Sequence, residues 1–503
     1  MKFYQHPWLT RRFANETGGF ADDTWTVNDR LTFNVGMRYD EMTAKYGEGA
    51  IYQFPTTPAD INNPTLLRTR AGTGNLFDFK DFSPRLGLAY ILTDDRRTVL
   101  RAHAGRYYSP LGVESLRRFG PDMEKEKLET WLYLLPMSEV DLNHNGMVDF
   151  NEVRPAYRLL VGRQPNLLLS SGTRDPSWSL QVAPGTKSPY TDQFELSLQR
   201  QLGRDYAVEG TAIYKRSKNF IALQPFNLAT GQNWEWTQSP FTTFTGFQTK
   251  GWQIALKDYN GDGKVDVDDA KYVLSHTGYR AANISTFDGQ SVHRDYDGLQ
   301  LVFTKRYSSR WQGLAGINWN HSSGIAPRML DQNWYIDGPM IMDTPFGTSY
   351  NDYQNNLNGP SLMTPRLMVK VNGSYTIPRV EADFGLRWRF DTGRPFWPIQ
   401  NIPTFASWMS STDGVFLTGN GNSQIVAADV KHPSWMPSTS IFDLSVGKTL
   451  RAVRGTQLYV DMTVLNALNE NSPNIIGFKQ GDFGRVYSIV QPRTYRVGVK
   501  LMF

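Results

Sequence analysis

The sequence lacks cysteine altogether, and it also lacks any long hydrophobic run. The absence of cysteine excludes disulfide bonds, thiol nucleophiles and cysteine-based metal sites. No segment approaches the roughly 18–20 consecutive apolar residues that a membrane-spanning helix requires, so a helical membrane protein is excluded. A β-barrel membrane protein is not excluded, because alternation dilutes the apolar residues along each of its strands.

An excess of charge of one sign is also missing, since 53 basic residues stand against 48 acidic residues and the net charge is +5. The basic residues are spread along the chain, which argues against a nucleic-acid partner. The histidines show no metal-ligand spacing, and no nucleophile elbow or phosphate-binding loop occurs, so we expect no enzyme. The opening MKFYQHPWLTRRF lacks the apolar segment and cleavage site of a signal peptide. If the protein is exported, we expect its beginning to lie upstream.

The sequence does contain long stretches in which apolar and polar residues alternate. RLTFNVGMRYD at 30–40, VEADFGLRWRFD at 380–391 and the closing TYRVGVKLMF all follow a period of two. In the last stretch, the apolar face carries Tyr495, Val497, Val499, Leu501 and Phe503. Such segments are longer than the 5–6 residues of a typical soluble strand. They have about the length of a tilted strand that crosses a bilayer.

Alternating segments predict thirteen strands, separated by connections of two kinds. Tight turns such as LGRD, YSSR and IPR alternate with long segments. The strands begin near residues 19, 30, 83, 97, 190, 204, 295, 310, 365, 380, 439, 455 and 488, and the long connections are 42–81, 110–188, 220–293, 325–363, 397–437 and the shorter 470–486. Short turns on one side and long loops on the other are typical of an outer-membrane barrel. The predicted fold is therefore an all-β, antiparallel transmembrane β-barrel. Because bacterial single-chain barrels have even strand numbers, we expect the chain to be the C-terminal part of a larger one.

An ordered series of segments resembles TonB-dependent outer-membrane receptors, particularly the Oar-like group. It comprises GGFADDTWTVNDRLTFNVGMRYD, DFSPRLGLAYILTDDRRTVLRAHAGRYYSP, SPYTDQFELSLQRQLGRDYAVEGTAIYKRSKN, DTGRPFWP and LYVDMTVLNALNENSP, with the final RTYRVGVKLMF. The similarity covers most strands from about residue 18 to 503 and leaves the long loops uncovered.

This resemblance implies that 1–503 is a partial receptor barrel in the outer membrane of a Gram-negative-type cell. Such receptors look like 22-stranded barrels with an N-terminal plug, so the plug, the TonB-contacting segment and about nine strands would lie outside this chain. The implied partners are the lipid bilayer, the TonB complex through the plug, and a small-molecule, peptide or glycan ligand. The resemblance also implies that Tyr495 and Phe503 on the last strand are read by the barrel-assembly machinery.

Two long loops contain a calcium-binding pattern, and the second, DYNGDGKVDVDD, lies within a predicted insertion at 254–278. A calcium ion takes six to eight oxygen ligands around a tight glycine turn, and the EF-hand loop places them at positions 1, 3, 5, 7, 9 and 12. Gly263 occupies position 6, and the ligand positions hold Asp258, Asn260, Asp262, Lys264 (through its backbone carbonyl), Asp266 and Asp269. A short helix is expected after this loop, within DDAKYVLSH.

The first loop, DLNHNGMVDFNE, lies within a predicted insertion at 123–160 and follows a helix-like segment, EKEKLETWLYLL. Its ligand positions hold Asp141, Asn143, Asn145, Met147 (through its backbone carbonyl), Asp149 and Glu152. A structural Ca²⁺ ion is expected in both loops, because external calcium concentrations saturate even weak sites. An Asx-rich turn that needs no ion is the alternative.

Aromatic side chains in the long loops are candidates for stacking on a ligand. The selected residues are Trp234, Trp236, Trp334 and Trp408. The alternative is that they pack the loops together or mark the membrane interface. Arg38, Arg387, Arg389 and Arg496 are expected on the polar strand faces, either as solvated lining or in contact with an anionic substrate or a plug.

Three functions remain open at this stage. The first is ligand uptake by the barrel of a TonB-dependent receptor. The second is a passive porin or a surface adhesin with calcium-stapled loops, and a plug encoded upstream would discriminate against it. The third is a soluble calcium-binding, carbohydrate-active β-protein, which predicts solubility without detergent and an acid/base pair.

Overall fold

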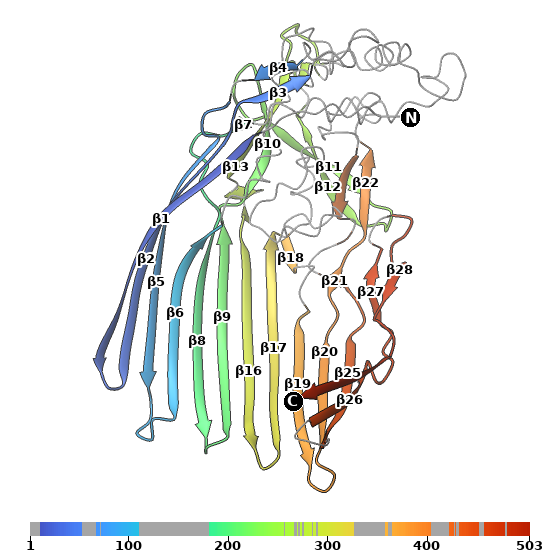
Figure 1. Ribbon diagram of the computed structural model, residues 1–503. Coiled ribbons are helices and arrows are strands. Elements are labelled where there is room, and N and C mark those ends of the chain that lie inside the picture. The colour runs from blue at the N-terminus through green and yellow to red at the C-terminus, as the bar shows by residue number, and fades with distance from the viewer. Residues whose placement is uncertain are drawn as a thin grey trace.

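The computed structural model is dominated by one large curved sheet of long strands, with shorter strands gathered at one end (Figure 1). It describes residues 11–52, 67–70, 72–109, 181–255, 257–265, 269, 272–273, 276–283, 285–287, 290–325, 358–360, 365–403, 422–426, 428, 432–451, 457–477 and 480–502. The described part of the chain contains no helix long and apolar enough to span a membrane.

The main sheet is antiparallel, and its long strands are hydrogen-bonded in sequence order. They are β1 (Arg12–Asn28), β2 (Leu31–Tyr46), β5 (Phe77–Ile91), β6 (Thr98–Tyr108), β8 (Tyr190–Leu202), β9 (Tyr206–Lys218), β16 (Arg294–Ser308), β17 (Trp311–Ile325), β19 (Leu367–Ile377), β20 (Ala382–Asp391), β25 (Thr439–Arg451), β26 (Gln457–Leu465) and β29 (Thr494–Met502). The short β18 (Asn358–Pro360) pairs with β17 beside this path. Within the described residues, β1 pairs only with β2 and β29 only with β26, so the ladder has two edges.

The two faces of this sheet differ sharply in polarity, because alternation sends successive side chains to opposite sides. One face, here called the apolar face, carries residues such as Val35, Leu86, Leu196 and Val497, which are between 51% and 68% exposed. The register aligns these residues strand after strand, as in the pairs Val35–Leu86 and Met462–Val497. An apolar surface this extensive is far larger than a soluble protein exposes, so it requires a cover such as lipid. The opposite side is called the polar face.

The edge strand β1 departs from the alternation of its neighbours. Asp23 stands opposite Val35 on the apolar face, whereas Phe20 stands opposite Arg38 on the polar face and is 75% exposed. The clean alternation therefore begins at β2.

The tight turns join consecutive strands at the short-turn end of the sheet. Arg96, Ser309, Arg310 and Glu381 adopt positive φ there, which allows the reversal within a few residues. The first turn is closed by Asn28, whose side-chain oxygen accepts the backbone N–H groups of Arg30 and Leu31 at 2.9 Å each.

Three predicted strand boundaries were wrong. The strand expected near residue 83 is β5, which begins at Phe77 because its first residues pair with the extended end of β2. The first strand begins at Arg12 rather than near residue 19, because the polar segment before it pairs in full with the extended end of β2. The last strand begins at Thr494 rather than near residue 488. Residues 486–489 form β28 (Val486–Ile489), which pairs with β27 (Pro473–Ile476) in the preceding loop. Pro492 separates β28 from β29, since proline cannot donate to a ladder.

The long loops contain short strands that the alternation did not predict. A three-stranded sheet is formed by β10 (Ile221–Asn227), β13 (Thr277–Asn283) and β7 (Gln181–Val182). The two-stranded pairs are β3 (Gly49–Tyr52) with β4 (Leu67–Arg70), β11 (Trp236–Thr242) with β12 (Gln248–Ile254), β14 (Thr286–Phe287) with β15 (Gln290–Ser291), β21 (Pro395–Phe396) with β24 (Ser434–Trp435), and β22 (Ile399–Pro403) with β23 (Asn422–Val426). Helical conformation occurs in the described residues only at Asp269, Tyr272, Val273 and His276.

Candidate functional surfaces

The long-loop end is covered by a cap, which we define as the β10–β13–β7 sheet together with its contacts to the main sheet. The cap packs on the polar face, where β1, β2 and β5 extend beyond β6 (Figure 1). Tyr46 and Phe77 from the long strands meet Ile221 and Ala281 from the cap, and all four are at most 1% exposed. A long loop is therefore folded inward over the polar face and held there by an apolar core.

A buried polar contact fixes the cap at its edge. The Ser188 hydroxyl donates to the Asp81 carboxylate at 2.5 Å, and the two residues are 1% and 3% exposed. Asn283 adds two side-chain N–H bonds of 2.9 Å, to the carbonyls of Lys187 and Asn219. Because a buried carboxylate without a donor is costly, Ser188 stabilises the docked position of the cap. Neither Ser188 nor Asp81 was selected from the sequence, since only the fold brings them together.

A second contact connects two different long loops. The backbone N–H of Phe244, at the tip of the β11–β12 hairpin, donates to the Gln400 side-chain oxygen at 2.6 Å. Gln400 lies in β22, and Figure 1 shows the hairpin beside that strand. The loop between β9 and β16, which contains the cap strands β10 and β13, thus contacts the loop between β20 and β25.

The polar face also carries a cavity of about 800 Å³ along β16, β17, β19, β20, β25, β26 and β29. Its lining includes Asn372, Arg387, Asp443, Thr463 and Arg496. Arg387 and Arg496 are exposed, and neither has an ion-pair partner within 4.0 Å among the described residues. Both arginines can therefore donate to an anionic group that enters the space over this face.

The other two arginines selected from the sequence behave differently from each other. Arg38 donates through Nε to both carboxylate oxygens of Asp40, at 2.9 and 2.7 Å, and contacts Glu16 at 3.3 Å. Its charge is already compensated. Arg389 is exposed on β20, directly opposite Lys370 of β19, so two cationic side chains are neighbours on the polar face there.

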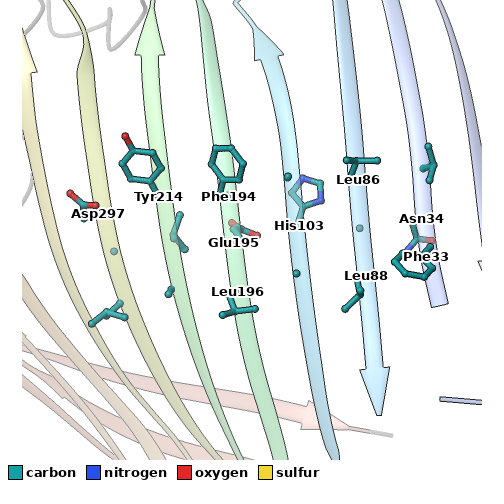
Figure 2. A pocket seen from close by; sticks show the side chains of 18 of the residues that line it. Phe33, Asn34, Leu86, Leu88, His103, Phe194, Glu195, Leu196, Tyr214 and Asp297 are labelled. Carbon is teal, nitrogen blue, oxygen red and sulfur yellow. The ribbon is translucent and has the colours of Figure 1, made fainter. Parts of the chain in front are cut away.

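A second concavity of about 770 Å³ spans β2 to β17 (Figure 2). Leu86, Leu196, Phe194 and Tyr214 line it and belong to the apolar rows, with Asn34, His103 and Glu195 contributed by the same strands. His103 is engaged with the Tyr107 hydroxyl at 2.7 Å. Most of the lining is apolar, so we assign this concavity to the sheet surface rather than to a chemical site.

The described residues of the second calcium-like loop form a tight turn. Gly263 has φ of 82°, a left-handed value that favours glycine at position 6. The Asp258 carboxylate accepts backbone N–H groups from Gly261 and Gly263 at 2.7 and 2.8 Å, and Asp262 accepts that of Lys264 at 2.8 Å. Asp269 is fully buried and accepts the N–H groups of Tyr259 and Asn260 at 2.7 and 3.2 Å. Asp258 and Asp269, at the first and last ligand positions, thus both accept N–H groups from the same short segment, residues 259–263.

No group of three or more His, Cys, Asp or Glu side chains arranged to hold a metal occurs in the described part of the chain. Asp266 of the second loop lies outside the described residues. The same is true of the whole first loop, with Asp141, Asn143, Asn145, Met147, Asp149 and Glu152.

The tryptophan selected first, Trp234, is a packing residue in this structure. It is 4% exposed, and its ring meets that of Tyr259 edge to face at 5.2 Å. Burial raises the pKa of the Tyr259 phenol to about 12, and the carboxylates of Glu235 and Asp269 act in the same direction. The phenol donates to the Ala255 carbonyl at 2.7 Å, so the calcium-like loop is attached to the β12 end.

The remaining selected residues are placed as follows. Trp236 begins β11, opposite Ile254 of β12. Tyr495 lies on the apolar face of β29, opposite Val464, and is 60% exposed. Trp334, Trp408 and Phe503 lie outside the described residues.

Comparison with solved structures returns outer-membrane receptors and transporters. The siderophore receptor PiuA from Acinetobacter baumannii shares 10% identity at a TM-score of 0.45, and the match covers 97% of this chain and 43% of that chain. The ferric-catecholate import receptor Fiu from E. coli K12 shares 11% identity at 0.44, covering 97% and 45%. The transporter YddB from Escherichia coli shares 9% identity at 0.45, covering 97% and 54%. This chain thus spans about half the length of these structures.

No curated protein matches the sequence. A family model described as an outer membrane beta barrel domain matches residues 5–397, which is more than half of the chain. The match includes the strands from β1 to β20, with their apolar and polar faces, and most of the long loops. The chain therefore belongs to the outer membrane beta barrel domain family, and its place is the Gram-negative outer membrane.

Proposed function

We propose that this chain forms part of the barrel wall of a TonB-dependent receptor, which takes up a ligand across the outer membrane. The observation that carries the proposal is the sheet itself. One face is apolar over many strands, while the other is polar and is covered at the long-loop end by an inward-folded cap. A soluble carbohydrate-active protein has no use for the apolar face, which disfavours that alternative.

The two sheet edges support the view that further strands belong to the whole protein. Each of β1 and β29 has one strand partner within the described residues. Unpaired backbone N–H and C=O groups cost several kcal/mol each in hydrocarbon, and closed barrels avoid them. We propose that about nine further strands and a plug, encoded upstream, complete a 22-stranded barrel, the even count that closure of single-chain barrels favours.

Partners follow from this proposal. The lipid bilayer covers the apolar face, and the assembly machinery reads the last strand at Tyr495 and Phe503. The TonB complex acts through the plug. The ligand is a small molecule, peptide or glycan that meets the outer loops, where Trp236, Trp334 and Trp408 offer stacking surfaces, and Trp234 would reach a ligand only if its contact with Tyr259 opened.

The reading frame upstream of Met1 provides the decisive test. We expect it to encode a plug and further strands. The product of the whole frame, reconstituted in a planar bilayer, should conduct little, and removal of the plug-coding segment should open a large conductance. A high conductance of the intact product would favour the passive porin, whereas no conductance in either form would favour the surface adhesin.

We also propose that a Ca²⁺ ion stabilises each of the two calcium-like loops. The described residues of the second loop fit such an ion, because Gly263 makes the tight turn and the side-chain oxygens of Asp258, Asn260 and Asp262 lie within one turn of chain. Carboxylate, amide and backbone carbonyl oxygens are the ligands that Ca²⁺ prefers. The ion would stabilise the folded conformation of the loop that carries Tyr259 and Trp234.

Thermal unfolding tests the calcium proposal. A ligand that binds only the folded state raises its stability by RT ln(1 + [L]/Kd). Calcium should therefore raise the melting temperature of the refolded protein, and a chelator should reverse the rise. Asp258→Ala with Asp262→Ala should remove the part of the shift due to the second loop, while Lys264→Ala, which keeps its backbone carbonyl, should not. An identical melting curve with calcium and with chelator would eliminate both sites.

A further inference from the structure

The cavity on the polar face has a floor of short, uncharged side chains. A row is the set of residues paired across successive strands, and one row here consists of Gln312, Ser374, Gly385, Ser445, Thr463 and Arg496. All of these residues line the cavity of about 800 Å³. Gly385 leaves room for the Ser445 hydroxyl, which a Cβ at position 385 would meet. The floor therefore offers hydroxyl and amide groups, and it carries no charge before Arg496.

Three arginines border this floor. Arg496 ends the row on β29, and Arg387 lies on β20, two positions beyond Gly385. Arg306 lines the same cavity at β16. All three arginines are exposed, and none of them makes an ion pair with a residue that the structure describes. The cavity therefore has an excess of uncompensated positive charge.

The one carboxylate among the described lining residues, Asp443, does not compensate this charge. Asp443 lies directly opposite Arg387 in the register, yet its Oδ1 accepts the backbone N–H of Asn466 at 2.8 Å. The Asn466 side chain in turn donates to the carbonyls of Glu470 and Gln491 at 2.8 Å each. Asp443 thus fixes the turn that follows β26, and the Arg387 guanidinium remains available to a ligand.

Cations continue from the cavity toward the long-loop end. Arg389 follows Arg387 on the same face of β20, and it lies opposite the exposed Lys370 of β19. Toward the short-turn end the sign reverses, because the next row of the polar face carries Asp383 and Asp461. An anion over this part of the sheet is therefore attracted from the long-loop side and repelled at the short-turn side.

The polar face of β2 differs from this region. There, Arg38 is held by both carboxylate oxygens of Asp40 and contacts Glu16 at 3.3 Å. Its charge is used within the wall, whereas Arg387 and Arg496 keep their donors for a molecule in the cavity. A guanidinium group presents paired N–H donors that match a carboxylate or a phosphate.

The spacing of the arginines indicates how many anionic groups the ligand carries. Arg387 and Arg496 are separated by three strand-to-strand steps and two residues along a strand. With about 4.8 Å per step and about 3.4 Å per residue, their Cα atoms are roughly 16 Å apart along the sheet. Long side chains that lean over the floor of this curved sheet shorten the gap (Figure 1). A molecule with several anionic groups can bridge it, whereas a single carboxylate reaches one arginine only.

We propose that the polar face between β16 and β29 binds a small polyanion, a solute with two or more carboxylate or phosphate groups, through Arg387 and Arg496. Arg306 borders the same site, and Arg389 and Lys370 attract the ligand from the long-loop side. The cavity has the size of a small-molecule site. This inference deepens the proposed uptake function, on which it rests for the position of the polar face in the lumen, because it makes the ligand anionic.

Calorimetric titration of the full chain, refolded in an uncharged detergent and free of calcium, tests the site. The probes are tripolyphosphate and tricarballylate, with inorganic phosphate and acetate as the matching small anions. We expect both polyanions to bind at least about tenfold more tightly than the small anions, because a second charge-assisted contact adds to the first. Arg387→Gln and Arg496→Gln should each weaken polyanion binding by about tenfold, and added salt should weaken it further.

Arg101→Gln is the matched control. Arg101 is exposed on the polar face of β6, away from the cavity, and donates to Gln199 at 2.9 Å, so its loss removes the same charge. An equal loss of affinity in Arg101→Gln and Arg387→Gln would overturn the proposal, because binding would then follow the overall charge. Equal affinity for tripolyphosphate and phosphate would overturn it as well.

Arg387→Lys and Arg496→Lys keep the charge and replace the glutamine variants if those do not fold. They should bind the polyanions less tightly than the unmodified chain, because lysine lacks the paired donors. The titration needs neither a plug nor conductance. Its failure would therefore leave the uptake function standing, and failure of the conductance experiment would leave the measured binding in place.

Discussion

The two ends of the sheet are stabilised in different ways. At the short-turn end, the periplasmic end of such barrels, the turns are joined by exposed ion pairs, such as Arg30 with Asp94 and Arg96 with Asp29. At the long-loop end, the cap buries an apolar cluster and a carboxylate. Exposed ion pairs contribute little to stability, whereas buried apolar side chains contribute most of it. The comparison teaches that the longer, less regular end depends on a core of its own.

Lys305 is the exception at the short-turn end. Its side chain is 1% exposed and lies over the rings of Tyr206 and Trp311, with Nζ at 5.1 and 5.0 Å from the centroids. Tyr206 follows one tight turn and Trp311 follows another, so this lysine connects two neighbouring turns. Its cation–π contacts and carbonyl acceptors make it a structural contact rather than a surface charge.

The largest expected effect is at the cap. Phe77→Ala should lower the free energy of unfolding by about 3–5 kcal/mol, because the ring is fully buried in the cap cluster. Asp78→Ala, exposed in the same strand, is the matched control. Denaturant unfolding in detergent measures the loss, and hydrogen exchange of Ile221–Asn227 should rise with it. A loss as small as that of the control would contradict the cap as a source of stability.

The next effect concerns the two faces between the ends. Leu196→Lys places a charge on the apolar face and should destabilise the folded protein in lipid vesicles by about 2–4 kcal/mol. Ser197→Lys is its neighbour on the polar face and should change the unfolding free energy far less. If both variants unfolded at the same denaturant concentration, the assignment of the apolar face to lipid would be wrong.

A smaller effect is expected at the edge of the cap. Ser188→Ala removes the hydroxyl that donates to the buried Asp81 carboxylate and should cost about 1–3 kcal/mol. Ser217→Ala, which removes a half-buried hydroxyl partner of Thr191, is the control. Local hydrogen exchange at the cap strands discriminates the two, since only Ser188→Ala should loosen the cap.

The smallest effect is expected at the exposed turns. Arg30→Ala should leave the unfolding midpoint almost unchanged at moderate salt, because water and ions screen the pair with Asp94. Lys305→Met, at the same end, should lower the midpoint, since it removes the buried ammonium group that donates to the carbonyls of Arg306 and Ser308. A larger change for Arg30→Ala than for Lys305→Met would reverse the comparison.

Sequence patterns predicted the long strands well and the loop contents poorly. The strands were found because period-two alternation is local, and the turns were found because they are short. The strands from β21 to β24 and the cap sheet were missed, since segments such as IALQPFN depend on partners many residues away. The strand expected near residue 488 was misplaced because the strand-like segment VYSI at 486–489 was assigned to the last strand, whereas it pairs with β27 in the preceding loop.

Among the candidate sites, too, local patterns were visible in the sequence, whereas contacts between distant segments were not. The calcium-like loop at 258–269 could be read from spacing, because its ligand positions are local, and Gly263 has the backbone conformation that position 6 requires. Trp234 was selected as a ligand contact from its type and location alone. Its burial against Tyr259 depends on how the loop folds, which no local pattern encodes.

By itself, the sequence determined which long strands form, which of their side chains share a face, and on which side the short turns lie. These properties follow from the two-residue period of an extended chain and from turn chemistry. Only the tertiary structure decided that a long loop folds inward onto Tyr46 and Phe77, and that Ser188 meets Asp81. It also decided the register between strands. Register depends on pairing between distant segments, so it is a property of the assembled sheet rather than of any one strand.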